Sequence, residues 1–336
     1  MKLKSEEGRE YMKRIFVSVF VIGLSMFFMI VPFSLGQAYL EEIRACHFLE
    51  QGKIEDAMTL LNRKLKRYPQ NYDCHLYLGL AYYLKGNFEK AMYTLNKVEF
   101  ETEKLEKAKT TMAAGKKLES FGQEDAYLAQ RGGVVFTKGR KGILKFALGM
   151  LYKKNKDFKN ARKRFSDAFK YKYPEFEARK QLLASLSFIK DYNRAQEQLK
   201  NLLEAGQKSD ALIFMEGYLA YYLKDENRAI ECFSKLSDSL PAAKRNLAVI
   251  YYNQGNYQKA LEIWQDILAD SPKDADSLKN SGRAYFHLGE KEKGQEQFDK
   301  IGLKIKVEKY SPKRIPLFLV DLFPDVKFDF QCQAKN

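Results

Sequence analysis

This 336-residue chain has little histidine, cysteine or tryptophan: three histidines, four cysteines and one tryptophan. None of the histidines has the serine and aspartate neighbours that would suggest a catalytic triad. The sequence also lacks a phosphate loop, a G-x-S-x-G nucleophile elbow, an H-E-x-x-H pair and a dinucleotide-binding glycine fingerprint. We therefore expect a protein that is not an enzyme, with no catalytic residues and no cofactor.

Small residues recur along the chain at a nearly fixed spacing. Four of the six intervals between them are 34 residues, one is 31, and one is 70, which leaves room for a degenerate unit near Ala126. The small residues are Ala57, Ala91, Ala161, Ala195, Ala229, Ala260 and Gly294, and the bulky residues four positions later are Leu61, Leu95, Phe165, Leu199, Phe233, Trp264 and Phe298. A period of this size predicts a repeat array.

Each repeat reads as two antiparallel helices. Twelve residues before most of the small residues stands a second small one, such as Gly79, which lets the helices approach closely. We expect Pro69, Pro241 and Pro272 to end the second helix of their units, because proline lacks the helix donor. The turn glycine is replaced by lysine in the middle units, at Lys156, Lys190 and Lys224, so these units are expected to be less regular.

Two segments carry the pattern most completely, "LYLGLAYYLKGNFEKAMYTL" (76–95) and "NLAVIYYNQGNYQKALEIWQDILADSP" (246–272). They resemble the tetratricopeptide repeat family, and the resemblance extends over 39–301. It implies an all-α, right-handed solenoid of about seven to eight helix-turn-helix units, here preceded by an apolar helix. We expect units one and two over 39–104, a degenerate unit and glycine-rich joint over 105–140, five units over 141–301, and a C-terminal tail over 302–336.

In this family the first helix of each unit lines a groove that binds partner proteins. The resemblance places aromatic and basic residues on that face, and such residues are enriched at protein interfaces. The expected groove residues are Tyr83, Phe146, Lys180, Phe214, Tyr218, Tyr221, Arg245, Tyr252, Lys279, Arg283 and Phe286. Any one of these rings can instead pack between units. Arg245, Asn246, Lys279, Asn280 and Arg283 only partly match a clamp for a terminal carboxylate, so an extended acidic or aromatic segment is the favoured ligand.

The N-terminal region predicts export. Residues 15–35 carry no charge over 21 positions, which is long enough to cross a membrane as a helix, and residues 1–14 are basic. The positive-inside rule then leaves 1–14 in the cytosol and the repeats on the far side. A transmembrane anchor over 15–36 is favoured by its length, while a cleaved signal peptide remains the alternative, because small residues precede Gln37.

Positive charge is concentrated between Lys138 and Lys180, in a chain with 58 Lys and Arg against 43 Asp and Glu. This basic stretch has two interpretations: a solvated helical face, or a site for an anionic envelope lipid or polymer. Nucleic-acid binding is disfavoured, because no recognition motif accompanies the charge.

The cysteines Cys46, Cys74, Cys232 and Cys332 are too scattered for a disulfide framework. Cys46 and Cys74 each precede a histidine, yet they stand at different helical phases, so no metal site is expected. A disulfide between Cys46 and Cys74 stays open if the domain faces an oxidising space.

The tail is apolar, with Ile315, Leu317 and Phe328 among its large side chains. Repeat arrays need their last apolar face covered, which favours a cap folded back on the final helices. Docking of the tail on a partner or on a second copy is the other interpretation, and the oligomeric state stays open. Together these features predict a scaffold on the outer side of a bacterial cytoplasmic membrane, binding a protein partner in a cell-envelope assembly.

Overall fold

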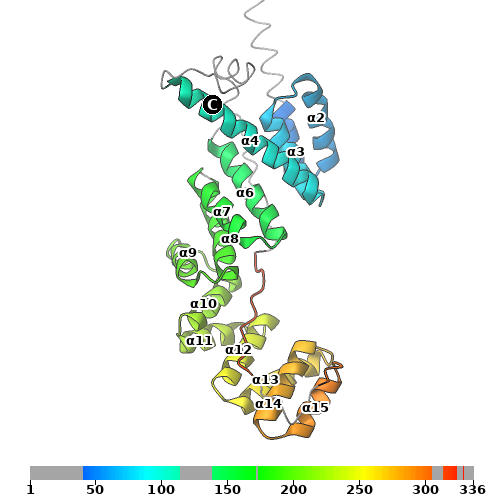
Figure 1. Ribbon diagram of the computed structural model, residues 1–336, viewed down its shortest axis with the longest axis vertical. Helices are drawn as coiled ribbons and strands as arrows, with labels where there is room; N and C mark the ends of the chain where they lie inside the picture. Colours follow the sequence, from blue (N-terminus) through cyan, green and yellow to red (C-terminus); the bar gives the residue numbers. More distant parts are fainter. Residues whose placement is uncertain (1–40, 114–137, 172, 305–312, 324–327, 329–336) are drawn as a thin grey trace, which may run out of the picture. The chain divides into compact units, whose positions relative to one another are not determined.

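The computed structural model describes residues 41–113, 138–171, 173–304, 313–323 and 328. Regular secondary structure in these residues is entirely helical. The chain divides into two compact units: unit 1 comprises Met1–Leu151 and Phe328–Asn336, and unit 2 comprises Tyr152–Lys327. Figure 1 shows successive helices labelled along the chain. The described residues form seven helix pairs, as the repeat count predicted.

Unit 1 begins with helical residues 41–50, which precede α2. Its further helices are α2 (Ile54–Arg67), α3 (Tyr72–Leu84), α4 (Phe88–Ala113) and the larger part of α6 (Lys138–Lys154). Consecutive helices α2, α3 and α4 pack on one another.

Unit 2 holds the end of α6 and nine further helices. These are α7 (Phe158–Lys170), α8 (Glu175–Phe188), α9 (Tyr192–Glu204), α10 (Asp210–Tyr222), α11 (Glu226–Leu236), α12 (Pro241–Asn253), α13 (Tyr257–Asp270), α14 (Ala275–His287) and α15 (Lys291–Asp299). From α7 to α15 each helix packs on the next, so unit 2 is a linear array whose core is shared between neighbours.

Helix starts follow from side chains that accept backbone hydrogen bonds. Asn71 Oδ1 accepts from the Cys74 amide at 2.9 Å, and Asp274 Oδ1 accepts from the Ser277 amide at 2.8 Å. Helix α12 begins with Pro241 itself, whereas α11 ends at Leu236. The expectation that Pro241 ends a helix was therefore wrong: proline at the first helical position needs no donor and has a suitable φ.

The small residues do bring the paired helices together, which confirms the interpretation of the repeat spacing. The seven small residues are fully buried or form close contacts, and their bulky partners are buried. A Cβ added to Gly79 would lie 2.5 Å from Leu95, and one added to Gly217 would lie 2.9 Å from the Cβ of Cys232. Only glycine fits at such crossings, because no space remains for a side chain.

The turns with lysine keep the geometry of the turns with glycine. Lys156, Lys190 and Lys224 have φ of 58°, 63° and 75°, while Gly255 has φ of 84°. The expected irregularity of the middle units is absent from these turns, because each lysine adopts the left-handed conformation that glycine adopts elsewhere. That conformation costs a residue with a Cβ about 1–2 kcal/mol.

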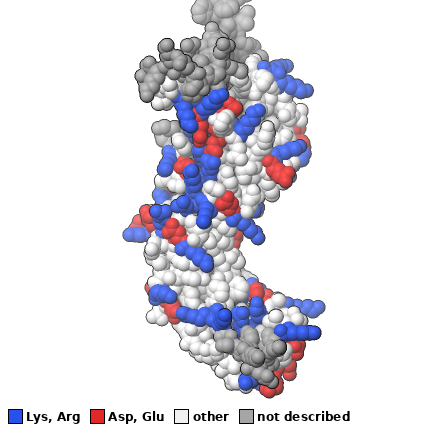
Figure 2. All heavy atoms as spheres, in the orientation of Figure 1, with Lys and Arg blue, Asp and Glu red and all other residues white. Residues whose placement is uncertain are grey.

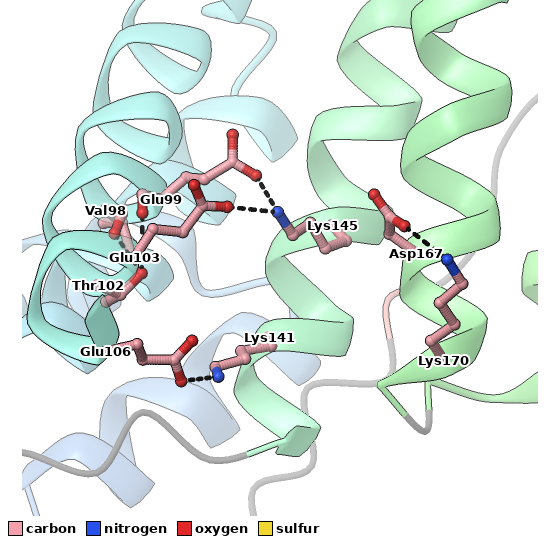
Figure 3. Close-up of polar contacts among 9 residues, drawn as sticks. All are labelled: Val98, Glu99, Thr102, Glu103, Glu106, Lys141, Lys145, Asp167 and Lys170. Carbon is pink, nitrogen blue, oxygen red and sulfur yellow. Dashed lines mark hydrogen bonds and ion pairs between the residues drawn. The ribbon is translucent and has the colours of Figure 1, made fainter. Parts of the chain in front are cut away.

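Helices α4 and α6 of unit 1 are joined by a cluster of opposite charges (Figure 3). Lys145 on α6 is buried and donates to Glu99 and, at 3.0 Å, to Glu103 on α4. Lys141 pairs with Glu106 one turn further along. Burial alone would lower the pKa of Lys145, but the bonds and charges of the two glutamates outweigh it and hold that pKa above its ordinary value.

Several predicted segments lie outside the described residues. They include the basic residues 1–14, the apolar segment 15–36 and the degenerate unit around Ala126. Within the expected joint over 105–140, α4 continues to Ala113 and α6 begins at Lys138, so both edges of that range are helical. Across the described ranges, no helix has the length and apolar character needed to cross a membrane.

Candidate functional site

Residues 313–323, called the tail segment below, lie in unit 2 against the first helices of four successive repeats. Figure 1 draws this segment as a red-brown line beside α12. Its contacts are with Lys153 of α6, Gln181 of α8, Tyr222 of α10, and Asn246 and Asn253 of α12. These five residues define the tail-binding face. The segment has no regular secondary structure, and its N-terminal end lies on α12 while its C-terminal end lies on α8 and α6.

Two asparagines of α12 recognise the main chain of the tail segment. Asn246 donates to the Phe318 carbonyl at 3.0 Å and accepts from the Phe318 amide at 2.7 Å. Asn253 does the same for Ile315, at 2.7 and 2.9 Å. A carboxamide that pairs with both groups of one residue replaces the hydrogen bonds of a neighbouring strand. This mode of recognition requires an extended segment and places no demand on its side chains.

The far end of the tail segment meets a buried cation. Lys153 Nζ donates to the Phe323 carbonyl at 2.7 Å and to Gln181 Oε1 at 2.7 Å, and lies 2.8 Å from Asp321 Oδ1. Gln181 itself donates to the same carbonyl at 3.1 Å. Because Lys153 is 6 % exposed, its charge requires these partners. An acidic residue of the tail thus supplies the counter-charge for a lysine of the face.

Apolar contacts fix the middle of the tail segment. Ile315 and Leu317 are each 5 % exposed and belong to the hydrophobic core of unit 2. The Leu317 amide donates to the hydroxyl of Tyr222 at 3.3 Å, and the Tyr222 ring stacks on Tyr192. Pro316, between the two buried side chains, is exposed. Two side chains of the segment therefore carry most of its burial, about 1.5–3 kcal/mol each.

In unit 1, Phe328 packs edge-on against two rings. Its centroid lies 5.1 Å from that of Tyr83 and 5.8 Å from that of Phe146. Phe328 is 6 % exposed, so it is part of the core of that unit. The chain beyond the repeats thus contributes buried side chains to both units, instead of lying over the last helices as a cap would.

The predicted groove residues have three different environments. Tyr83 and Phe146 contact Phe328, and the Tyr221 hydroxyl accepts from Asn253 at 2.8 Å. Another group packs inside the array: Phe214 on Phe233, Tyr218 near Tyr222, Tyr252 on Trp264, and Phe286 near Phe298. The charged residues form local pairs: Lys180 with Glu177, Arg245 with Asp274, and Arg283 with Asn280, while Lys279 is half-buried on α14.

Most of the tail-binding face was missed by one residue position. The expected groove residues were counted 8, 11 and 15 residues before each small residue, which includes Arg245. Most of the residues that hold the tail segment stand 7 or 14 before it, as Asn253 and Asn246 do before Ala260. Seven residues are two helical turns, so these positions share one face. Amide side chains recurring at that spacing are a signal that the sequence contained.

The basic stretch is largely engaged in ion pairs. Arg140 lies 3.6 Å from Asp73 and over the Tyr77 ring, and Arg179 pairs with Glu175 at 2.7 Å. Further pairs join Lys141 to Glu106, Lys145 to Glu99, Lys153 to Asp321, Lys170 to Asp167 and Lys180 to Glu177. Figure 2 shows acidic side chains interspersed with the basic ones on the face drawn. Most of this charge stabilises helix contacts or local pairs, which favours the solvated-face interpretation.

The cysteines near the N-terminus do not pair with each other. Cys46 is disulfide-bonded, and Cys74 is free, so the open pairing of Cys46 with Cys74 is wrong. The other free cysteine of the described ranges is Cys232, whose pKa burial raises to about 11. His47 pairs with Glu50 and His75 with the Pro69 carbonyl, so the two histidines face different partners.

Three comparisons relate the chain to known proteins. A family model described as tetratricopeptide repeat matches residues 44–103, 214–275 and 245–301. The photosystem I assembly protein Ycf3 of Prochlorococcus marinus is 30 % identical over 93 residues, which are 26 % of this chain and 54 % of Ycf3. The chain therefore spans about half the length of that relative.

Solved structures that are similar to the chain share little of its sequence. A tetratricopeptide repeat protein from Parabacteroides merdae is 16 % identical, with a TM-score of 0.49, and the match covers 79 % of this chain and 92 % of that one. MamA from Desulfovibrio magneticus is 17 % identical, with a TM-score of 0.43 and coverages of 49 % and 95 %. With its helix pairs, its buried small residues and the matched repeats, this chain belongs to the tetratricopeptide repeat family.

Proposed function

We propose that this protein is a non-enzymatic scaffold whose tail-binding face receives an extended segment of a partner protein. The observation that carries the proposal is the pairing of Asn246 and Asn253 with both main-chain groups of Phe318 and Ile315. Amides placed in this way recognise a chain that has no secondary structure of its own. Scaffolding through protein contacts is the general role of the tetratricopeptide repeat fold.

The chemistry of the face defines the class of ligand. Apolar pockets hold two side chains that stand two residues apart, Ile315 and Leu317. Lys153 then supplies a cation for a carboxylate four residues after the second of them, at Asp321. The preferred ligand is therefore an extended segment with aliphatic side chains followed by an acidic residue. This agrees with the extended acidic or aromatic segment expected from the sequence.

We further propose that the repeats lie outside the bacterial cytoplasmic membrane, in a cell-envelope assembly such as secretion, pilus or flagellar assembly, or envelope biogenesis. The support is the uncharged segment 15–35 with basic residues before it. The disulfide of Cys46 suits an oxidising compartment. A reporter enzyme that works only in the periplasm, fused after residue 304, should be active. Activity of the matching cytosol-specific reporter alone would contradict the location.

Crosslinking in the native cell tests the binding function. A photoreactive amino acid replaces Tyr221, whose hydroxyl accepts from Asn253 beside the tail segment, and, as a matched control, Tyr93 on α4, whose side chain is 73 % exposed. We expect a discrete adduct with one protein from position 221 and none from position 93. Identical adducts from both positions, or none from 221, would argue against partner binding at this face.

A further inference from the structure

The tail segment occupies the tail-binding face before any partner arrives, and its role there rests on the proposed function of that face. We propose that the tail segment is an intramolecular ligand of the tail-binding face, and that the partner displaces it with a segment of the same chemical pattern. The surface is thus an interaction site for an extended aliphatic and acidic peptide, occupied in the free protein by residues 313–323.

The form of the contacts supports a ligand role. The face contributes side chains from four helices, α6, α8, α10 and α12, while the tail segment contributes mainly its main chain. Such contacts are available to any extended segment, whereas core packing depends on particular side chains. Only Ile315 and Leu317 of the tail segment are fully buried; Phe318, Leu319 and Val320 are half-buried. A different segment therefore needs to reproduce few positions.

The face also tolerates being emptied. Its polar groups belong to Asn246, Gln181 and Lys153, which are hydrated by water when the tail segment leaves. Emptying the face exposes two aliphatic side chains of the tail, which a partner's aliphatic side chains replace on the face. Exchange thus conserves the kinds of contact made.

Attachment to the same chain gives the tail segment an advantage over free peptides. Helix α15 ends at Asp299, so few residues separate the array from the tail segment, and short links give effective concentrations in the millimolar range. A free peptide binds only the fraction of molecules whose face is open, and its apparent affinity falls by that fraction. Releasing the tail segment should therefore tighten the binding of a peptide added in trans.

The test measures binding of a fluorescent synthetic peptide with the sequence of residues 313–323, KRIPLFLVDLF, to full-length variants. The release variant carries Ile315→Asp and Leu317→Asp. The matched control carries Lys313→Asp, because Lys313 is exposed. We expect the release variant to bind the peptide at least about tenfold more tightly than the wild type, in keeping with the open-fraction argument. The control should bind like the wild type. Adding Asn246→Ala and Asn253→Ala to the release variant should remove the gain.

Circular dichroism and gel filtration establish that each variant is folded and monomeric. A folded release variant that does not bind the peptide, or that binds it no more tightly than the wild type, would overturn the proposal. A wild type that forms a dimer, while the release variant is a monomer, would also overturn it in favour of tail exchange between two copies.

A second measurement does not depend on the release variant folding. In the wild type, the amides of Ile315, Leu317 and Phe318 donate hydrogen bonds, so hydrogen exchange at these positions should be slow. Excess peptide should accelerate it, and unchanged exchange at saturating peptide would refute displacement. If the peptide binds as expected but no cellular partner crosslinks at position 221, the intramolecular ligand stands and the proposed scaffold function fails.

Discussion

Asn246 and Phe318, which are 72 residues apart in the sequence, exchange two hydrogen bonds through one side-chain amide and one peptide unit. Asn246 is fully buried. Its replacement by alanine leaves the amide and the carbonyl of Phe318 without these partners, and a buried polar group without a partner costs about 1–3 kcal/mol.

We therefore expect Asn246→Ala to lower the free energy of unfolding by about 1–3 kcal/mol in urea denaturation. It should also loosen the tail segment, visible as faster hydrogen exchange at Phe318. The control is Asn280→Ala, since Asn280 stands 34 residues later at the same repeat position and accepts from Arg283. Faster exchange at Phe318 in the control as well would argue against a specific role of Asn246.

The buried cation of unit 1 gives a prediction about pairing. Lys145→Met leaves Glu99 buried without this cation, which should cost about 3–5 kcal/mol, while Lys145→Met with Glu99→Met should lie close to the wild type. A double-mutant cycle in urea measures both. Equal losses in the single and double variants would show that the pair itself is unimportant.

The direction of the pH dependence follows from the pKa of Lys145, which is held above its ordinary value by Glu99 and Glu103 despite burial. The ion pairs therefore contribute fully below the unfolded pKa of about 10.4, and the contribution is lost as pH rises through the higher folded pKa. Urea unfolding between about pH 8 and pH 11 should show this loss in the wild type and not in Lys145→Met. A parallel decline in both proteins would assign it to other groups.

The left-handed turns predict that a substitution can stabilise the array. Lys190 has φ of 63°, so Lys190→Gly should raise the free energy of unfolding by about 1 kcal/mol. The reciprocal change Gly255→Lys, at φ of 84°, should lower it by a similar amount. Thermal unfolding of the two variants checks both signs. A destabilised Lys190→Gly protein would mean that contacts of the lysine outweigh the backbone strain.

Close helix crossings predict a graded response to added methyl groups. In Gly217→Ala the new Cβ would lie 2.9 Å from the Cβ of Cys232, which cannot move without its helix. In Gly79→Ala the nearest atom is the terminal Cδ2 of Leu95, which can rotate away. Overpacking costs about 1–3 kcal/mol, so we expect the larger loss of melting temperature for Gly217→Ala. The reverse order would contradict the assigned crossings.

The disulfide of Cys46 can be identified by peptide mapping. Cys74 and Cys232 are free, so among the four cysteines of the sequence we expect Cys332 to be the partner. Mass spectrometry of a non-reduced digest should find the peptides of Cys46 and Cys332 linked, and reduction should separate them. A thiol assay that finds Cys46 reactive in the unreduced protein would disprove this bond.

Periodic features of the sequence predicted the array well. Ala57 and Leu61, and their counterparts in later units, are buried because a repeat must place the same small and large residues at the same helix crossing. Local patterns determine such contacts, since each helix packs on the next. The helix pairs and most core positions therefore follow from spacing alone.

The tail-binding face could not be located in the same way. Asn253 is one residue away from the position at which groove residues were sought, and one residue is about 100° around a helix. The place of the tail segment has no local signal, because its hydrogen bonds join residues 62 to 170 positions apart. An extended segment of mixed apolar and acidic residues can lie on many surfaces, so only three-dimensional packing selects one.

The position of the tail segment at the end of the chain has a consequence for synthesis. Every helix from α6 to α15 precedes residue 313, so the repeats can pack on their neighbours while the chain is still being made. The face on α6, α8, α10 and α12 is then complete before its own ligand leaves the ribosome. A nascent molecule thus passes through an interval in which the face is open, and a partner present at that moment binds without competition.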